Sequence, residues 1–213
     1  MSILSKTAAN LHTIQRHLDS LDSESSRDLF NELPSTTQAQ LERLWAVLYS
    51  DFGRKNIPAN GGSWSDVHHP GDSIWIPDGS TIPADKGYSN MQQKNWSRIL
   101  HENQIKGIPF SNGWPCFESI AKASVSFDWE DELGPLGLIE LANSERSKLH
   151  NIAFRILAGE RNESIEATMA WKEKENLVWH EQEDCKTVLL VPREVHDNIK
   201  HIGGRIMLQV ILG

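Results

Sequence analysis

The tightest constraint on this chain lies near its C-terminus, where two short apolar runs flank a polar stretch. Residues 177–180 and 187–191 are rich in Leu, Val and Trp, and each run has the length of a β-strand. The polar residues 181–186 between them predict a loop, so the two runs should pair as an antiparallel hairpin.

A short helix is predicted directly after this hairpin. Pro192 suits the first position of a helix over residues 193–200, because its missing N–H costs nothing there. The adjacent Gly203 and Gly204 are expected to end that helix. The order strand, loop, strand, helix over about 177–204 is therefore the predicted core of the C-terminal part.

Side chains that carry chemistry are concentrated in this unit. His180 and Glu181 stand at the end of the first predicted strand, and His196 and His201 lie on or just beyond the helix. Residues five positions apart do not share a helix face, so His196 and His201 converge only if the helix ends shortly before His201. Three imidazoles and a carboxylate then meet at one point, and neutral imidazole nitrogen is a good ligand for zinc, nickel and similar ions.

Such a centre suits the hydrolysis of phosphodiesters. A metal ion with three protein ligands can polarise a phosphate oxygen and stabilise the leaving alkoxide, and a nearby carboxylate of suitable pKa can deprotonate water. Any one histidine alone fits a surface or core position equally well, so the combination carries the prediction. The candidate phosphate-binding residues, for each of which a solvated surface position is the alternative, are Lys186, Arg193, Lys200 and Arg205.

These motifs resemble those of toxin nucleases of the HNH/endonuclease VII superfamily, which occupy the C-termini of bacterial polymorphic toxins. The resemblance covers roughly residues 60–204. It implies a ββα-metal fold, one divalent cation (zinc, nickel, magnesium or manganese), a nucleic-acid substrate and a cognate immunity protein as partner. The shared segments are 62–64, 72–78, 107–117, 179–181 (Trp-His-Glu), 186–192, 194–196 and 201–204.

The resemblance also implies roles for single residues. His180, His196 and His201 correspond to metal ligands, and Glu181 stands where relatives keep a histidine as general base. Glutamate is a weaker base unless partial burial raises its pKa. The roles of His180 and Glu181 could also be exchanged, with His180 as the base and Glu181 on the metal. His150, on a predicted helix, is interpreted as structural.

The rest of the chain is predicted to complete an α+β fold with a helical N-terminal region and an irregular middle. Residues 1–52 carry apolar residues at 3–4 spacing and form the helical region, and residues 53–213 form the nuclease domain. Residues 54–90 are rich in Gly, Pro, Asn, Ser and Asp, which indicates a long loop with turns. The further elements predicted are helices at about 91–103 and 144–158, a helix opened by Asn162 or Ser164 that runs to about 176, a strand and turn at 107–113, a strand at 123–129, and an acidic loop at 128–132.

Composition limits how this chain can bind nucleic acid and where it can reside. The formal net charge is −8, which argues against a broad basic face but not against a few local cations around a metal. The two cysteines indicate neither a disulfide framework nor a thiolate zinc site. No apolar run reaches membrane-spanning length, and the N-terminus lacks the apolar core of a signal peptide. We expect a soluble protein with no membrane partner, either cytoplasmic in the producing cell or exported without a cleaved signal.

The function predicted from these features is metal-dependent nucleic-acid hydrolysis by an antibacterial toxin or effector. DNA is favoured over RNA, and little sequence specificity is expected because no segment resembles a base-reading module. One alternative is a non-catalytic interaction protein that keeps a degenerate HNH metal site, which metal binding without cleavage would favour. Another is an endonuclease of a mobile element or defence system. Toxicity on expression, with rescue by a neighbouring gene product, would separate a toxin from such an enzyme.

Overall fold

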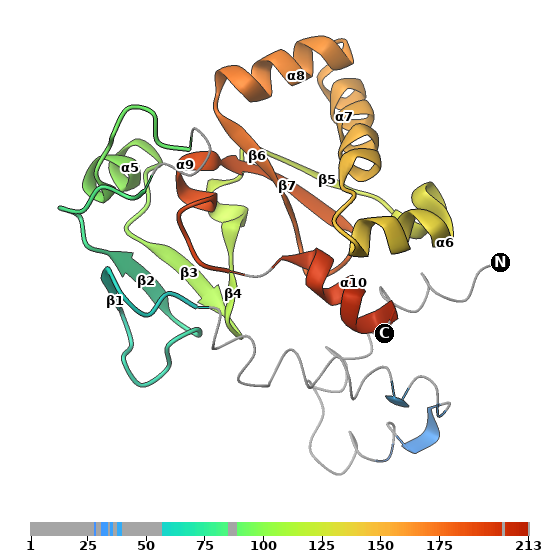
Figure 1. Cartoon of the computed structure of the whole chain (residues 1–213), viewed down its shortest axis with the longest axis horizontal. Coiled ribbons are helices and arrows are strands. Elements are labelled where there is room, and N and C mark those ends of the chain that lie inside the picture. Colours follow the sequence, from blue (N-terminus) through green and yellow to red (C-terminus); the bar gives the residue numbers. More distant parts are fainter. Residues whose placement is uncertain are drawn as a thin grey trace.

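The computed structural model describes residues 57–84, 89–201 and 203–212, together with 28, 31–33, 35, 38 and 39. Apart from those few positions, the predicted helical region 1–52 lies outside the described residues. The described part combines helices with antiparallel sheets, which confirms the predicted α+β class (Figure 1). None of its helices has both the length and the apolar character needed to cross a membrane.

Four short strands form one antiparallel sheet in the order β1-β2-β3-β4. The strands are β1 (Gly62–Trp64), β2 (Ile74–Pro77), β3 (Ile108–Ser111) and β4 (Trp114–Pro115). The strand and turn predicted at 107–113 are confirmed by β3 and the turn after it. The prediction of an irregular segment over 54–90 missed β1 and β2. Strand β1 has three residues, and all four residues of β2 are apolar, so neither sequence shows the alternation of apolar and polar residues that predicts a strand. The two strands pair with Trp64 opposite Trp75, whose ring centroids lie 5.3 Å apart.

A second antiparallel sheet has the order β5-β7-β6 and contains the predicted hairpin. Its strands are β5 (Ala123–Ser126), β6 (Leu177–Glu181) and β7 (Thr187–Pro192). The central strand β7 is buried on both faces: Val188 and Leu190 belong to one core cluster, and Leu189 and Val191 to another. Burial on both faces explains why β7 has a continuous apolar run in place of the alternation typical of a half-exposed strand.

Longer helices cover this central sheet on one side, and the first sheet lies on its other side together with shorter helices (Figure 1). The helices of the described part are α5 (Trp96–Glu102), the 3₁₀ turn η1 (Phe117–Ile120), α6 (Trp129–Ala142), α7 (Ser147–Arg161), α8 (Ile165–Lys174), α9 (Arg193–His196) and α10 (Gly204–Leu212). Helices α6, α7 and α10 contribute to one core cluster, whereas α5, η1 and α9 contribute to the other. Strand β7 is thus the layer that both cores share.

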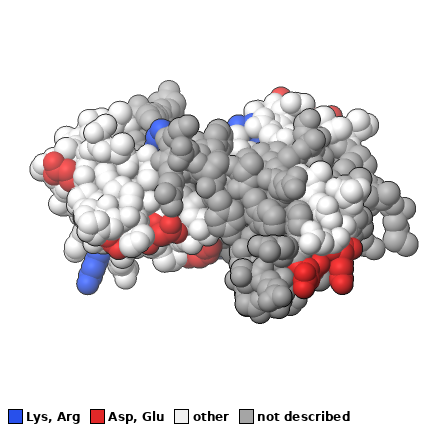
Figure 2. Space-filling view, turned by 90° about the horizontal axis from the view of Figure 1, so that it is seen from below, with Lys and Arg blue, Asp and Glu red and all other residues white. Residues whose placement is uncertain are grey.

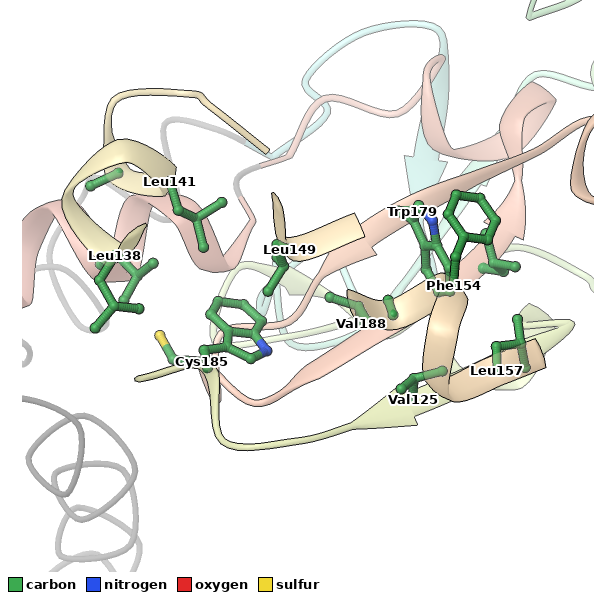
Figure 3. Packing of buried hydrophobic residues seen from close by; sticks show 14 of the residues in the cluster. Val125, Leu138, Leu141, Leu149, Phe154, Leu157, Trp179, Cys185 and Val188 are labelled. Atoms are coloured by element: carbon green, nitrogen blue, oxygen red, sulfur yellow. The ribbon is translucent and has the colours of Figure 1, made fainter. Parts of the chain in front are cut away.

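The first core cluster joins α6 and α7 to the central sheet (Figure 3). Phe154 of α7 packs edge-on against Trp179 of β6, with ring centroids 5.3 Å apart. Leu149 and Val188 are fully buried between the same elements. Each such side chain contributes on the order of 2 kcal/mol through removal of apolar surface from water. Cys185 is buried in this cluster as a free thiol, and Cys116 is also free.

The structure corrects the predicted start of one helix and adds a helix that the sequence did not predict. The predicted helix at 91–103 begins only at Trp96, because the Asn95 side chain caps it by accepting a hydrogen bond from the Arg98 amide at 3.0 Å. The predicted acidic loop at 128–132 belongs mostly to α6, which begins at Trp129 and is kinked at Gly134, where φ is 67°. The strand predicted to reach Trp129 therefore stops at Ser126.

The ends of α7 and α8 follow local capping. Helix α7 runs past Gly159, where the sequence predicted its end, and stops at Asn162, which adopts a left-handed conformation with φ 53°. The helix predicted at 164–176 is confirmed as α8, whose N-cap Ser164 accepts a hydrogen bond from the Ala167 amide at 3.1 Å.

Candidate metal centre

Three histidines predicted as metal ligands lie together at the junction of β6, α9 and the segment before α10. His180 belongs to β6, His196 is the last residue of α9, and His201 follows five residues later. One ring nitrogen from each histidine lies within 4.8 Å of the other two, and Nδ1 of His180 is 3.3 Å from Nε2 of His196. Three converging imidazole nitrogens are a donor set suited to a zinc or nickel ion with an open coordination position.

The convergence depends on a helix that is shorter than the sequence predicted. Helix α9 ends at His196, and turn-like backbone bonds from Asn198 to Val195 and from Ile199 to His196, at 3.2 and 3.4 Å, carry the chain off the helix axis. His201 is thereby brought back beside His196, with ring centroids 4.6 Å apart. The predicted helix over 193–200 is wrong in length, and a continuous helix would have separated these two rings.

The sequence predicted that Gly203 and Gly204 end a helix. This prediction is wrong, because Gly204 begins α10. They allow the backbone to pass close to the end of β6. A Cβ on Gly204 would overlap the carbonyl oxygen of Gln182, and a Cβ on Gly203 would lie 3.3 Å from the carbonyl oxygen of Glu181. The two glycines therefore seat the chain after His201 against the strand that carries His180.

Replacement of Gly204 tests this close approach. We expect Gly204→Ala to lower the free energy of unfolding by about 2 kcal/mol, because the added methyl group overpacks against rigid backbone. Denaturant unfolding measures the effect. Gly159→Ala on α7 is the matched control, since no atom lies within 4 Å of its Cβ, and it should leave stability unchanged or raise it by about 0.5–1 kcal/mol. Equal stability of the two variants would contradict the proposed contact.

Hydrogen bonds fix two of the three rings in the tautomer that a metal requires. Nδ1–H of His196 donates to Oδ1 of Asp197, and Nδ1–H of His201 donates to the carbonyl oxygen of Ile199, each at 2.8 Å. With the proton held on Nδ1, Nε2 of both rings keeps a free electron pair for a cation.

Burial favours the neutral form of two of the imidazoles, those of His180 and His201. Burial, together with the nearby His201 and His196, holds the pKa of His180 well below its ordinary value. Burial also lowers the pKa of His201 to about 4, although its hydrogen bond to Ile199 opposes the shift. Neutral imidazole is the form that binds metal, so no proton has to be displaced from either ring near neutral pH.

Phe117 of η1 packs against all three histidines and is fully buried. Its ring centroid lies 4.9 Å from that of His180, 5.6 Å from that of His196 and 5.3 Å from that of His201. An aromatic ring at this position excludes water from one side of the cluster and limits the rotamers of the three histidines. Phe117 lies in the segment 107–117 that carries the resemblance, but no spacing rule connects it to residues more than sixty positions later, so its sequence position alone predicted no role for it.

A buried ion pair holds α9, and with it His196, against α5. Glu194 is 9% exposed, and its carboxylate accepts from Nζ of Lys94 at 2.7 Å and from Nδ2 of Asn103 at 3.1 Å. Lys94 lies 100 residues upstream of Glu194, and Asn103 lies 91 residues upstream of it. Sequence reasoning missed this support because nothing local in the chain signals the pairing.

Glu181 lies in a different environment from the histidine cluster. Its carboxylate, with the side chain only 5% exposed, is 3.0 Å from Nε2 of His150 and 3.5 Å from Nε of Arg146. Burial raises the pKa of Glu181, but the hydrogen bond to His150 and the charge of Arg146 outweigh it, so the pKa lies below its ordinary value. Among the described residues, the group with metal-ligand spacing consists of the three histidines and does not include Glu181.

The four predicted phosphate-binding residues occupy different environments. Lys186 and Lys200 are exposed, on the β6–β7 loop and on the segment just before His201. Arg193 forms an ion pair with a neighbouring carboxylate at 3.7 Å, and Arg205 donates to a carbonyl oxygen at the end of α6 at 3.1 Å. Arg146, which the sequence analysis did not select, is 45% exposed beside Glu181. Its charge is close enough to the cluster to lower the pKa of His180.

Acidic side chains are grouped on one face of the molecule. On the face drawn in Figure 2, the described residues show grouped Asp and Glu side chains and few Lys or Arg. Together with the net charge of −8, this distribution disfavours binding of a polyanion over that face.

The loop between β6 and β7 contains a carboxyl group that should make stability depend on pH. Burial, reinforced by the nearby Asp184 and Glu118, raises the pKa of Glu183 to about 7. The folded state therefore holds this proton more tightly than the unfolded chain, and stability falls as the pH rises from about 4.5 through 7.

Between pH 4.5 and pH 8, the parent protein is expected to lose about 2 kcal/mol more stability than Glu183→Gln, which carries no titratable group there. Urea unfolding at both pH values measures the difference. Glu160→Gln, on the exposed surface of α7, should follow the parent protein. Parallel pH dependences of the parent and Glu183→Gln would contradict the prediction.

Part of the chain is similar to a known family of protein domains. Residues 108–203 match the family model described as the DNase/tRNase domain of colicin-like bacteriocin. The matched range contains both strands of the hairpin and all three histidines. No curated protein and no solved structure matches the chain. The match supports a toxin nuclease domain acting on nucleic acid in this part of the chain.

Proposed function

We propose that this protein is a metal-dependent nuclease of the HNH, ββα-metal type. The observation that carries the proposal is the convergence of His180, His196 and His201 within the segment that matches colicin-type nuclease domains. Strands β6 and β7 followed by α9 supply the two strands and helix that this type of site requires.

The residues of the cluster have separable tasks in this proposal. His180, His196 and His201 hold one divalent cation, which would polarise a phosphate oxygen and stabilise the departing oxygen. Phe117 keeps water from one side of the cluster. Arg146, half-exposed beside the cluster, attracts a phosphate group, and the exposed Lys186 and Lys200 contact neighbouring phosphates.

The biological role we infer is that of an antibacterial toxin or effector. The match to a bacteriocin domain supports this role, and such a toxin needs a cognate immunity protein in the producing cell. We favour DNA over RNA as the substrate and expect little sequence specificity, with the nuclease domain within 53–213 and a separate region at 1–52. The family description names both DNase and tRNase domains, so both polymers belong in the test.

Cleavage by the purified protein tests the proposal. Plasmid DNA and total RNA are incubated with the protein in EDTA, and then with added magnesium, manganese, nickel or zinc. We expect DNA cleavage with a divalent metal and none in EDTA. Cleavage of RNA alone would correct the substrate. No cleavage of either polymer by folded protein under any metal would overturn the nuclease function.

Two further readouts separate the alternative functions. A metal-induced rise in melting temperature without cleavage would favour the non-catalytic interaction protein, because metal bound only to the folded state stabilises it. Toxicity on expression, relieved by a neighbouring gene product, is expected for a toxin. An active nuclease without such toxicity would favour an endonuclease of a mobile element or defence system.

A further inference from the structure

A cavity of about 750 Å³ lies between the first sheet, α5 and the segment that follows α9. Its apolar lining includes several prolines and the indoles of Trp64, Trp75 and Trp96, and its polar lining includes Asn198 and Lys200. Sites for small ligands typically have this size and combine aromatic walls with a few polar groups. The cavity is therefore large enough for one nucleobase with its sugar.

We propose that this cavity binds one unstacked nucleobase of the substrate strand, next to the phosphate held by the histidine triad of His180, His196 and His201. The inference rests on the nuclease function proposed above and deepens it, because it assigns a base-binding subsite and a preference for single-stranded nucleic acid. Stacking on an aromatic ring accepts any of the bases, since every base has a π face. The subsite therefore agrees with the low sequence specificity expected of this protein.

The cavity shares a wall with the candidate metal centre. Ile199 lines it, and the carbonyl oxygen of Ile199 accepts a hydrogen bond from Nδ1–H of His201 at 2.8 Å. Lys200 also lines the cavity, is exposed and directly precedes His201. Consecutive Cα atoms are about 3.8 Å apart, so a cationic residue stands beside a candidate metal ligand. A strand with one phosphate at the triad would thus have its neighbouring nucleotide beside the cavity and its backbone near a lysine.

Trp64 is the indole best placed for stacking, because it is half-buried whereas Trp75 and Trp96 are almost completely buried. Its Nε1–H donates to the carbonyl oxygen of Pro58 at 3.3 Å. Its ring centroid lies 5.3 Å from that of Trp75 and 5.1 Å from that of Phe110. These contacts fix the ring before a ligand arrives, so little side-chain freedom is lost on binding.

Backbone hydrogen bonds hold the loops around the cavity. The carbonyl oxygen of Thr81 accepts from the Trp96 amide at 2.9 Å, and that of Gly61 accepts from the Asp78 amide at 2.8 Å. Thr81 and Gly61 line the cavity and belong to the turn-rich segment 54–90. Irregular segments of such length are uncommon in compact domains and often carry a function. Binding of a nucleobase would give this segment one.

The proposal predicts which form of nucleic acid is cleaved faster. In a duplex each base is paired and stacked, so it must leave the helix before it can enter the cavity, at a cost in free energy. We therefore expect a single strand to be cleaved at least about tenfold faster than a duplex of the same sequence.

The test uses the full-length protein with the metal that supports its cleavage. The substrate is an oligothymidylate, or an oligouridylate if only RNA is cleaved, with one abasic nucleotide placed at each position in turn. Loss of the base should slow cleavage roughly 10–100-fold at the bond a fixed distance from the abasic position, while the other bonds of the same strand are cleaved as before. Cleavage that ignores the abasic position would overturn the inference.

Variants of Trp64 connect this effect to the cavity. Trp64→Ala is expected to lose the dependence on the abasic position, to cleave the intact strand roughly 10–100-fold more slowly and to keep the metal affinity of the parent protein. Trp64→Phe still offers an aromatic ring and should retain most of the cleavage. The matched control is Trp171→Ala, since Trp171 is also a half-buried indole but lies on α8, outside the cavity, and this variant should cleave like the parent.

The outcomes separate this inference from the nuclease function. Cleavage by Trp64→Ala at the parent rate, loss of its metal affinity, or equal cleavage of single strand and duplex by the parent overturns the inference and leaves the nuclease function intact. If Trp64→Ala does not fold, the abasic scan of the parent protein decides alone. If the parent cleaves no polymer with any metal, the nuclease function fails. Affinity for the oligothymidylate in EDTA then decides on the cavity, and equal affinities of the parent and Trp64→Ala overturn the inference.

Discussion

His196→Ala is expected to abolish metal-dependent cleavage and to weaken metal binding by on the order of 100-fold or more. This loss of affinity is larger than that usually caused by mutating a residue that only hydrogen-bonds to a metal ligand. His196 contacts both other histidines of the cluster. Its Nε2 lies 3.3 Å from Nδ1 of His180, and its ring centroid lies 4.6 Å from that of His201. Loss of its imidazole leaves two protein nitrogens, too few to hold a catalytic cation firmly. A reaction that depends on several kcal/mol of charge stabilisation by the metal should then slow by roughly 10³-fold or more.

Titration calorimetry with nickel or zinc, beside plasmid cleavage, measures both effects. The fold should survive, because α9 remains attached through Glu194 to Lys94 and Asn103. Asp197→Ala provides a graded comparison: it removes the acceptor of the His196 Nδ1–H bond and should weaken metal binding roughly 10–100-fold. If His196→Ala bound metal as tightly as the parent protein, the histidine triad would not be the metal site.

Phe117→Ala should be the most destabilising of the substitutions considered, lowering the free energy of unfolding by about 3–5 kcal/mol. Phe117 is fully buried, and its removal opens a cavity beside the three histidine rings that it contacts. The rings would then be free to adopt other rotamers. The gain in stability on metal binding should therefore also shrink, because part of the binding energy must reorder the ligands.

Urea unfolding in EDTA and in saturating metal separates the two parts of this prediction. Phe117→Leu is the matched control, since it keeps most of the volume and should cost less than about 1.5 kcal/mol. Equal losses for the Ala and Leu variants would show that Phe117 contributes little through packing. An unchanged metal-induced stabilisation in Phe117→Ala would show that the ring does not hold the histidines in place.

The local pattern of the chain was enough to predict the hairpin and the candidate ligands. Apolar runs of strand length separated by polar residues predict a hairpin, and the structure forms it as β6 and β7. The histidines were selected by residue type and spacing, and the structure places His180, His196 and His201 together. Their role as ligands, and the assignment of proton transfer to His180 or Glu181, stay predictions.

Helix ends were predicted less well, because they depend on single capping contacts. Helix α5 begins only after its N-cap residue Asn95. Helix α7 continues through Gly159, because a helix interior tolerates glycine at modest cost. Helix α9 stops at His196 although the pattern continued to residue 200. This early end brings His201 to the cluster, and it meets the condition that the sequence set for convergence, namely a helix that ends before His201.

The remaining features were decided only by the tertiary structure. The sequence by itself determined which side chains are available and that β6 and β7 pair, since both follow from residue type and short-range periodicity. The folded chain alone decided that His150 meets Glu181 and that Lys94 meets Glu194, across 31 and 100 positions of sequence. Contacts over such separations depend on how the helices pack on both faces of the central sheet, and no local interaction along the chain encodes that packing.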